Sequence, residues 1–591
     1  MNSYIQRSIN YIHKNQELVS KTFLALVYLI CLKNYLQFIV YRVFISPTND
    51  SFALTQWLLL RGLAVIYFIS WISLKCQVLG LFGKNGIIPI EKTVTYQKRD
   101  RSSIWTSPSL FLFTNTISDN LLLNFCNIGL VCSILLFFDI APTLNLTVLY
   151  IFYLSFKNVG EDFFQLQFDN LLLETGFIAL LLPPFKVIPF LPGLEFGQVY
   201  HRSIWYLFHF FNIRLLVASG ICKLSSGDVN WLNGKALDYH WWTQPMPLST
   251  SYYFQKLPTM LKFVGCISHF LIEIICPILL MIPLFKSINS IALLTLQIMI
   301  MVSGNYGTFN LVSLLLGFSF FSDNDLPVVV VETIRDLVHI SNYTIELPLF
   351  SNLQSWLNVY MALIGVAIVS FTVMMSFIPF SQVFRGIMLP PLSLYKVYMY
   401  IEPFGLLNYY GLFAVMTTSR KEIIFQGSID GVEWKEYEFK YKIGDINHIP
   451  LFVLGHLPRL DWRLWFNQFH GFSINGEFWF HSFILKLLKN EKDVMDILSP
   501  KNKNMFVVDK QQKDSNSKIT PPKYVRAMIT PYKFSFDSSA SRKELIRKDE
   551  QGVDQIWENG KWWSRKLPLL QYSPIAKLSD NGEKLVYKAK I

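Results

Sequence analysis

Long apolar stretches recur through the first two thirds of the chain and constrain its fold more than any other feature. They are Trp57–Leu74, Leu121–Ile140, Pro142–Phe156, Leu171–Phe185, Ile204–Ala218, Met260–Phe285, Ile288–Val302, Phe309–Phe321 and Trp356–Phe377. A helix needs about 20 apolar residues to cross the roughly 30 Å hydrocarbon layer of a bilayer. Several stretches are shorter, as is usual for re-entrant, tilted or buried segments. We therefore expect an α-helical multi-pass membrane bundle with at least five spans and up to about nine.

The composition supports a membrane protein. Of the 591 residues, 52% are hydrophobic and 16% are charged, which excludes a disordered or purely solvating chain. Soluble chains carry roughly a quarter charged residues, so much of this surface faces something other than water. The formal net charge of +12 indicates lipid headgroup attraction or a topology bias. Because no nucleic-acid motif accompanies it, we expect membrane lipids, and no nucleic acid, as partners.

Composition divides the chain into three parts. Residues 1–50 form an N-terminal lead-in, residues 51–385 a transmembrane helical domain, and residues 386–591 a soluble C-terminal domain. From Arg385 onward, 31 Lys and Arg stand against 22 Asp and Glu, so most of the net charge lies in the last part. None of the seven cysteines forms a CxxC pair and none follows Cys276, so we expect the C-terminal domain to fold without disulfides.

The lead-in contains an apolar stretch of ambiguous character. Thr22–Phe44 is interrupted by Lys33 and Asn34. A lysine at the centre of a bilayer helix costs about 2.5–3.5 kcal/mol, so an interfacial helix, a span leaning on protein and a lipid-exposed span all stay open. No small-residue cleavage site follows, and we expect no removable signal peptide.

The C-terminal domain carries strand signals. Glu422–Gly427 and Val432–Lys442 flank the turn pair Asp430-Gly431, and aromatic residues alternate with charged ones in the second segment, which predicts a β-hairpin. Short aromatic strands elsewhere favour a mainly β, sandwich-like module. The segment Ser541–Glu544 matches a capping box and predicts a short helix.

Polar residues recur inside or beside the apolar stretches. The candidate inward polar cluster consists of Asp169, Glu174, Arg214, His269, Glu273 and Asn305. Ionisable groups inside a membrane are costly, so they face inward and either pair or line a wet cavity. A functional site and a set of helix-to-helix hydrogen bonds and salt bridges both fit this pattern.

No established catalytic motif is present. The serine-hydrolase elbow GxSxG, the zinc motif HExxH and the phosphate loop are absent, and we expect no catalytic, cofactor-binding or metal-binding residue. His269 and Glu273 are four positions apart, a spacing that suits a helix-stabilising pair and also part of a metal site. Asp238 and His240 fit an acid–base pair or an ordered interfacial loop.

Several long strings carry a resemblance. They are DNLLLETGF (169–177), RLLVASGICKLSSGDVNWLNGKALDYHWWTQPMP (214–247), HFLIEI (269–274), VSGNYGTFN (302–310), YGLFAVMTTSRKEIIFQGSIDGVEWKEYEFKYKIGD (410–445), RLDWRLWF (459–466), PPKYVR (521–526) and GKWWSRK (560–566). With these strings in this order, the chain resembles the lipase maturation factor family. The resemblance covers nearly all of the chain beyond about Phe52.

The resemblance implies a multi-pass protein of the endoplasmic reticulum membrane, not an enzyme. Such a protein assists the folding and assembly of secreted lipases, which would be its partners, and its C-terminal domain lies in the lumen. The candidate family-motif residues are Asp228, Trp231, His240, Arg459, Asp461 and Trp462.

Charge and sequons bear on the orientation. The loop after the first firm span is basic, and positive loops normally stay cytosolic, whereas the family's orientation makes this loop luminal. Asn49 in Asn49-Asp50-Ser51 is the candidate glycosylation site. Asn145 lies in an apolar stretch, where we expect it to be unreachable, and the use of Asn342 depends on topology.

Two other functions remain open at this point. An intramembrane enzyme acting on lipids or on a luminal protein would place Glu174, Arg214, His269 and Glu273 around one site. A transporter would use the same polar residues as a pathway.

Overall fold

The computed structural model describes most of the chain beyond residue 51. The described residues are 52–100, 102–182, 198–280, 282–329, 331–333, 353–384, 390–506, 520–535, 543–548 and 554–588, with five isolated helical positions between 22 and 37. The stretch Thr22–Phe44 therefore lies almost entirely outside the described residues, as do Asn49 and Asn342.

Six helical segments among the described residues are long and apolar enough to cross a membrane. They are α2 (Ala53–Lys75), α6 (Asp119–Phe137), Tyr200–Ser225 of α9 (Gln198–Ser225), Thr259–Leu279, α15 (Lys286–Ser303) and Trp356–Phe384. The fourth joins α13 (Thr259–Phe270), the π-helical turn η5 (Leu271–Ile275) and α14 (Cys276–Leu279), and the last joins α18 (Leu353–Met375), α19 (Phe377–Ser381) and a 3-10 turn. These helices confirm the prediction of a multi-pass bundle.

Three further helices complete the bundle. They are α7 (Pro142–Val159), α8 (Gln167–Leu180) and α16 (Phe309–Phe318). Each contributes side chains to one large apolar core, for example Leu149, Leu172 and Leu316, which are fully buried. Because other parts of the protein cover these helices on several sides, they can be shorter or less apolar than a lipid-exposed span.

Short helices connect the long ones. They are α3 (Val78–Phe82), α4 (Ile90–Gln97), α5 (Ser103–Thr106), α10 (Val229–Leu232), α11 (His240–Thr243), α12 (Ser249–Gln255) and α20 (Leu392–Ile401). Tyr398 of α20 packs with Met375 and Leu407, so helical packing continues past residue 390. The domain boundary at residue 385 stays a prediction.

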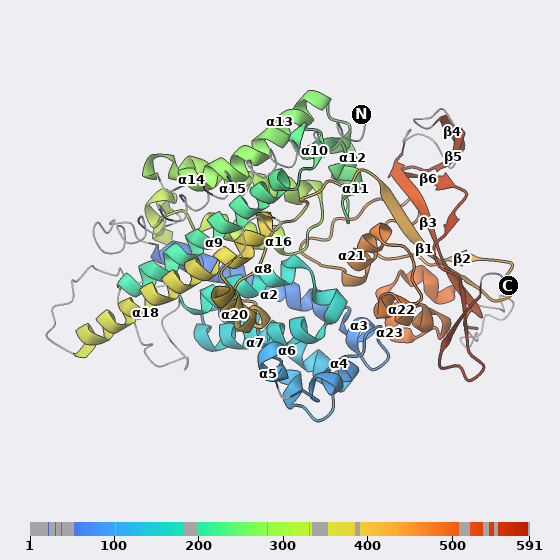
Figure 1. Ribbon diagram of the computed structural model, residues 1–591, viewed down its shortest axis with the longest axis horizontal. Helices are drawn as coiled ribbons and strands as arrows, with labels where there is room; N and C mark the ends of the chain where they lie inside the picture. The colour runs from blue at the N-terminus through green and yellow to red at the C-terminus, as the bar shows by residue number, and fades with distance from the viewer. Residues whose placement is uncertain are drawn as a thin grey trace, which may run out of the picture.

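The described part of the C-terminal region consists of an antiparallel sheet and the α-helices α21 (Arg459–Phe466), α22 (Phe478–Leu488) and α23 (Lys492–Ile497). The strands are β1 (Arg420–Ser428), β2 (Lys435–Glu436), β3 (Tyr524–Phe534), β4 (Lys543–Lys548), β5 (Asp554–Asn559), β6 (Trp563–Leu567), β7 (Leu570–Gln571), β8 (Ile575–Leu578) and β9 (Leu585–Lys588). Their order is β2-β1-β3-β6-β5-β4, with β7 and β8 also on β3, and β9 on β8. Helices α21 to α23 lie between the sheet and the bundle (Figure 1).

The mainly β character is confirmed, but three details differ from the prediction. The described strands form one curled sheet covered by helices rather than a sandwich. The segment Lys543–Lys548 is strand β4, paired with β5, and not a helix. The hairpin exists, but its second strand is only Lys435–Glu436. The Tyr437 N–H still donates to the Phe425 carbonyl of β1 at 2.8 Å, and beyond it the backbone pairs elsewhere: the Ser499 N–H donates to the Glu438 carbonyl, and the Lys442 N–H donates to Asp461.

Candidate functional site

A buried aspartate–arginine pair joins the bundle to the C-terminal region. Asp169 lies in the first turn of α8, and Arg459 begins α21. The Arg459 guanidinium donates to the two carboxylate oxygens of Asp169 at 2.8 and 2.6 Å, a bidentate geometry. The Tyr153 hydroxyl donates to the same carboxylate at 2.6 Å, and the guanidinium lies 3.7 Å from the Phe164 ring centre. We call this junction the first clamp.

The end of α2 extends the first clamp. The Gln77 side chain accepts the Arg459 backbone N–H at 2.9 Å and donates to the Leu457 carbonyl at 2.8 Å. The Ser73 hydroxyl oxygen accepts the Leu457 N–H at 3.0 Å. Since these backbone groups are buried, Ser73 of α2 and Gln77 just beyond its end fix the chain before α21.

A second clamp surrounds Glu174 of α8. Arg214 of α9 donates to one carboxylate oxygen of Glu174 and to the Ser376 hydroxyl, the latter at 3.1 Å. The other carboxylate oxygen accepts from the Tyr410 hydroxyl at 2.8 Å and from the Asn408 backbone and side chain at 3.1 and 3.0 Å. Two bundle helices thus hold the segment that leads into β1.

A third clamp lies at the start of the sheet. Arg420 of β1 donates to the backbone carbonyls of residues 242, 244 and 245, including that of Pro245 at 3.0 Å. Its guanidinium also pairs with Glu422 at 2.6 Å, and Lys442 pairs with the second Glu422 oxygen at 2.7 Å. The side chains of Arg420, Glu422 and Lys442 are all buried, so a buried charged group joins the sheet to the bundle loop that contains residues 242–245.

Lys223, Glu273 and His269 form a fourth buried group, inside the bundle. Lys223 of α9 lies 2.7 Å from one Glu273 oxygen, and His269 lies 3.1 Å from the other. The ring of Trp231 stacks on His269 at 5.6 Å and lies beneath Lys223 at 5.5 Å. The spacing of His269 and Glu273 thus produces a pair. Within the described ranges, no three His, Cys, Asp or Glu side chains are placed to share a metal ion.

Two family-motif residues order the loop after α9. Asp228 caps α10 by accepting the Asn230 N–H at 2.7 Å, and it also accepts the Met416 N–H at 2.8 Å. His240 contacts the Tyr306 hydroxyl at 2.8 Å, and burial lowers the pKa of His240 to about 3. Asp238 pairs with Lys262 at 3.5 Å rather than with His240.

The other predicted residues also lie at the junction. Asp461 accepts the Lys442 and Tyr441 N–H groups at 2.7 and 3.2 Å, and Trp462 packs edge-on against Phe168 at 4.9 Å. Asn305 donates to the Leu451 carbonyl at 2.8 Å and accepts the Val453 N–H at 3.1 Å.

The sequon residue Asn145 does not lie at the junction but is buried within α7.

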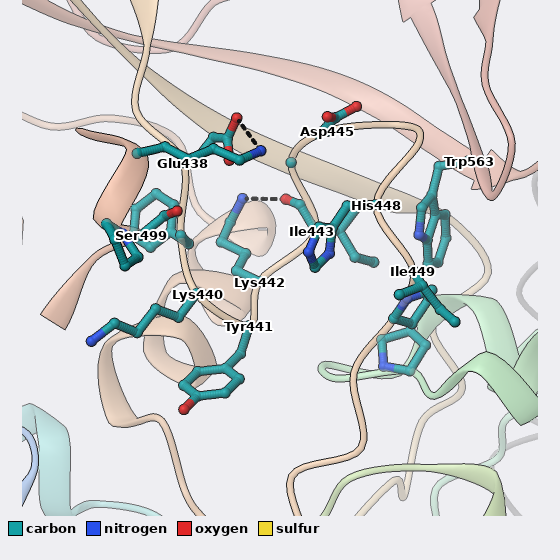
Figure 2. Close-up of a pocket in the computed structure, with 16 residues that line it drawn as sticks. Glu438, Lys440, Tyr441, Lys442, Ile443, Asp445, His448, Ile449, Ser499 and Trp563 are labelled. Carbon is teal, nitrogen blue, oxygen red and sulfur yellow. Dashed lines mark hydrogen bonds and ion pairs between the residues drawn. The ribbon is translucent and has the colours of Figure 1, made fainter. Parts of the chain in front are cut away.

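A cleft of about 210 Å³ opens in the C-terminal region (Figure 2). Figure 2 shows Glu438 and Lys440 on one side and Asp445 and His448 on the other, with Trp563 beside them. Asp445 and His448 are exposed, whereas Trp563 is buried. The cleft therefore combines an apolar wall with an accessible charged rim.

Comparison with known proteins identifies the family. A family model described as the lipase maturation factor transmembrane domain matches residues 54–328, and one described as the lipase maturation factor C-terminal domain matches residues 406–572. The chain belongs to the lipase maturation factor family. The two matched regions correspond to the bundle and to the module that the clamps attach to it.

Relatives in this family match over most of their length. Lipase maturation factor 2 of Xenopus laevis is 27% identical over 88% of this chain and 82% of its own. The human lipase maturation factor 2 is 27% identical over 89% of this chain and 83% of its own length. The mouse lipase maturation factor 1 is 25% identical over 90% of this chain and 89% of its own length. No solved structure matches the chain.

The candidate residues named from the sequence include both members of the Asp169–Arg459, Glu174–Arg214 and His269–Glu273 pairs, but not all of the other partners. Lys223, Tyr410 and Arg420 were not among the candidate site residues. Lys223 had a usable signal, because a lysine and a glutamate in two apolar stretches avoid isolated burial by pairing. Arg420 and Tyr410 had none, since Arg420 lies in the polar string Thr417–Glu422, which is typical of a solvent-exposed segment, and Tyr410 lies among apolar and aromatic residues.

Proposed function

We propose that this chain is a membrane-bound, chaperone-like factor that assists the folding and assembly of secreted lipases in the endoplasmic reticulum, with its C-terminal region in the lumen. The observation that carries the proposal is the match to relatives named lipase maturation factor 1 and 2 along nearly the whole chain. The arrangement of the two matched regions supports a binding role.

The C-terminal region is joined to the bundle by buried contacts and presents accessible surface. Three buried clamps fix it, while the cleft keeps an exposed rim. Next to the cleft, the apolar side chains of Ile449, Phe452 and Leu454 are 43%, 60% and 57% exposed. Exposed apolar groups rimmed by polar residues mark interaction sites. We infer that a partly folded lipase contacts this surface.

The buried charges favour attachment over catalysis. Both Glu174 oxygens are occupied by hydrogen-bond donors. Arg214 and Lys223 lie nine positions apart on α9, about 13 Å along the helix axis, so the Glu174 and Glu273 groups do not line one site. This separation gives no support to an intramembrane enzyme with a single site built from all of these residues.

The proposal is tested by removing the protein from cells that secrete lipases. We expect the activity per unit mass of secreted lipase to fall while lipase transcript stays level, and the wild-type chain to restore it. Unchanged specific activity of every secreted lipase in the deficient cells would refute the proposal.

Charge reversal at the cleft tests the client surface. The double variant Asp445→Arg, His448→Glu should reduce restoration about tenfold, which corresponds to about 1.4 kcal/mol of client binding. Asp580→Arg, an exposed change in the β8–β9 turn, is the matched control and should restore fully. Full restoration by the double variant would exclude the cleft as the contact surface.

A further inference from the structure

A second cavity, of about 350 Å³, lies inside the bundle between α9, α13, α15 and α16. Leucine, isoleucine, methionine and aromatic side chains form most of its wall. The ring of Phe413, from the segment before β1, contacts His240 and Tyr306 in the same wall. The cavity is thus separate from the cleft of Figure 2 and from the three clamps.

The cavity opens sideways between α13 and α15. Leu261 of α13 and Met299 of α15 line it and are 55% and 47% exposed. Both helices belong to segments long and apolar enough to cross a membrane. An opening between two such helices faces hydrocarbon, so a ligand enters from the bilayer and not from water.

A change in helical winding shapes the wall beside the charged group. Pro277 has no N–H to give to the Glu273 carbonyl, and the preceding turn, Leu271–Ile275, widens to a π-helix. Glu273 lies in this turn and lines the cavity with Lys223 and His269. Single π-turns in α-helices are frequent at functional sites.

The polar groups in the wall compensate one another's charge. Lys223 and Glu273 pair at 2.7 Å. Tyr306 donates its hydroxyl hydrogen to Gln244, so the 2.8 Å contact from His240 is a donation by Nε2–H of a neutral ring. Ser313 is 3% exposed, and within the described chain its Oγ has no hydrogen-bond partner. The wall therefore holds its lysine paired with its glutamate, with His269 3.1 Å from the same carboxylate, and offers the Ser313 hydroxyl as a hydrogen-bonding group.

We propose that this cavity binds an uncharged membrane lipid, with a hydrocarbon chain against the apolar wall and a hydroxyl or ester head near Ser313, as in a mono- or diacylglycerol. Burying an ionised head group here would leave a charge without a partner, which costs several kcal/mol. A hydroxyl or ester oxygen, in contrast, can accept a hydrogen bond from the Ser313 hydroxyl. The proposal does not depend on the client of the C-terminal region.

Photolabelling of the purified full-length chain in phosphatidylcholine nanodiscs tests the proposal. The probe is a monoacylglycerol with a photoreactive chain, compared with the fatty acid and the phosphatidylcholine that carry the same chain. We expect the monoacylglycerol to label peptides within residues 259–316, and unlabelled monoacylglycerol to compete. Equal labelling of these peptides by the fatty acid or the phospholipid would overturn the assignment to an uncharged lipid.

Cavity-filling variants separate specific binding from membrane contact. A side chain at Gly265 of α13 would meet only the end of Leu237, at 3.0 Å from its Cβ, so Gly265→Leu projects into the cavity. Gly265→Leu and Ser313→Leu should each reduce labelling about tenfold. Val264→Leu enlarges an exposed neighbour that does not line the cavity and should label as wild type.

The folding of each variant is checked by its thermal unfolding midpoint. If Gly265→Leu and Ser313→Leu both unfold, Thr295→Trp at the exposed mouth of the cavity replaces them. Wild-type labelling in a folded cavity variant would refute the site.

Discussion

At the scale of single residues, buried charges hold the molecule together at the boundary between bundle and sheet. Asp169 and Arg459 are 290 positions apart in sequence and share a bidentate contact. Removing one member of a buried pair leaves the other charge without a partner, which is costlier than losing an exposed pair. The stability of the junction should therefore depend strongly on each member.

We expect Asp169→Asn and Arg459→Met each to destabilise the chain by about 3–5 kcal/mol, and the double variant by less than the sum. Thermal unfolding of the purified variants measures the loss. The control is Asp162→Asn, because Asp162 and Arg463 form a 2.9 Å pair that is partly exposed and contributes about 1 kcal/mol or less. Additive single losses would contradict direct coupling.

Asp461 should make stability depend on pH. Burial raises the pKa of Asp461 to about 6, although the N–H groups of Lys442 and Tyr441 act to lower it. The native chain thus keeps a proton that an unfolded aspartate releases near pH 4. The stabilisation is complete below about pH 4 and is lost as the pH rises through about 6, amounting to about 2–3 kcal/mol.

Unfolding midpoints measured from pH 4 to pH 7 test this effect. The decline with rising pH should be smaller in Asp461→Asn, which keeps the acceptor oxygen and cannot ionise, than in the wild type. Parallel curves for the two proteins would show that Asp461 does not titrate in this range.

The inward position of these residues follows from the sequence, but their partners do not. An ionisable side chain in an apolar stretch must avoid lipid, so Asp169, Glu174 and Glu273 are identifiable as inward. Their partners depend on which segments fold together, and for Asp169 and Glu174 the contacts include residues after position 400. No local pattern records such a pairing.

At the scale of elements, close approach of α2 and α6 depends on a glycine. A Cβ at Gly129 of α6 would lie 2.3 Å from the Trp71 ring of α2, and Trp71 is fully buried. The ring also packs edge-on against Tyr153 at 5.5 Å, so it has little room to move. The contact therefore needs a residue without a side chain at this position.

We expect Gly129→Ala to destabilise the bundle by about 1–3 kcal/mol through overpacking, in spite of the better helix propensity of alanine. Gly265→Ala is the matched control on α13, where only the flexible end of Leu237 is near, and should be neutral or stabilising. The comparison uses thermal unfolding of both variants. A stabilised Gly129→Ala variant would mean that Trp71 can shift without cost.

Helices were more predictable than strands. An apolar stretch specifies a membrane helix by length alone, because every backbone hydrogen bond is internal to it. A strand depends on a partner: Gln426 of β1 pairs with Arg526 of β3, one hundred positions later. A turn at Asp430-Gly431 could be predicted from local chemistry, whereas the limits of β2, which starts at Lys435 and not at Val432, could not.

At the scale of the whole molecule, the loop after α2 shares a side with the C-terminal region. Helix α3 packs against α23, and the Ser482 hydroxyl donates to the Ile87 carbonyl at 2.5 Å (Figure 1). If the C-terminal region is luminal, the basic loop after α2 is luminal too. Its charge then opposes the usual positive-inside bias, so other segments must set the orientation.

The start of α2 lies at the opposite end of the bundle. Asp323, which follows α16, accepts the Leu54 and Thr55 N–H groups at 3.3 and 3.1 Å, whereas the end of α2 holds the chain before α21. Asn49 lies outside the described residues, four positions before α2. A membrane-crossing α2 therefore makes glycosylation at Asn49 and a luminal C-terminal region mutually exclusive.

Glycosylation mapping tests the proposed orientation most directly. Glu583→Thr makes the exposed Asn581 the acceptor of an Asn-X-Thr sequon in the β8–β9 turn. We expect a glycosidase-sensitive mass shift in this variant, its loss when Asn581→Gln is added, and no change of mass in Asn49→Gln. An unmodified Asn581 together with a glycan on Asn49 would place the C-terminal region in the cytosol and contradict a role in lipase maturation within the lumen.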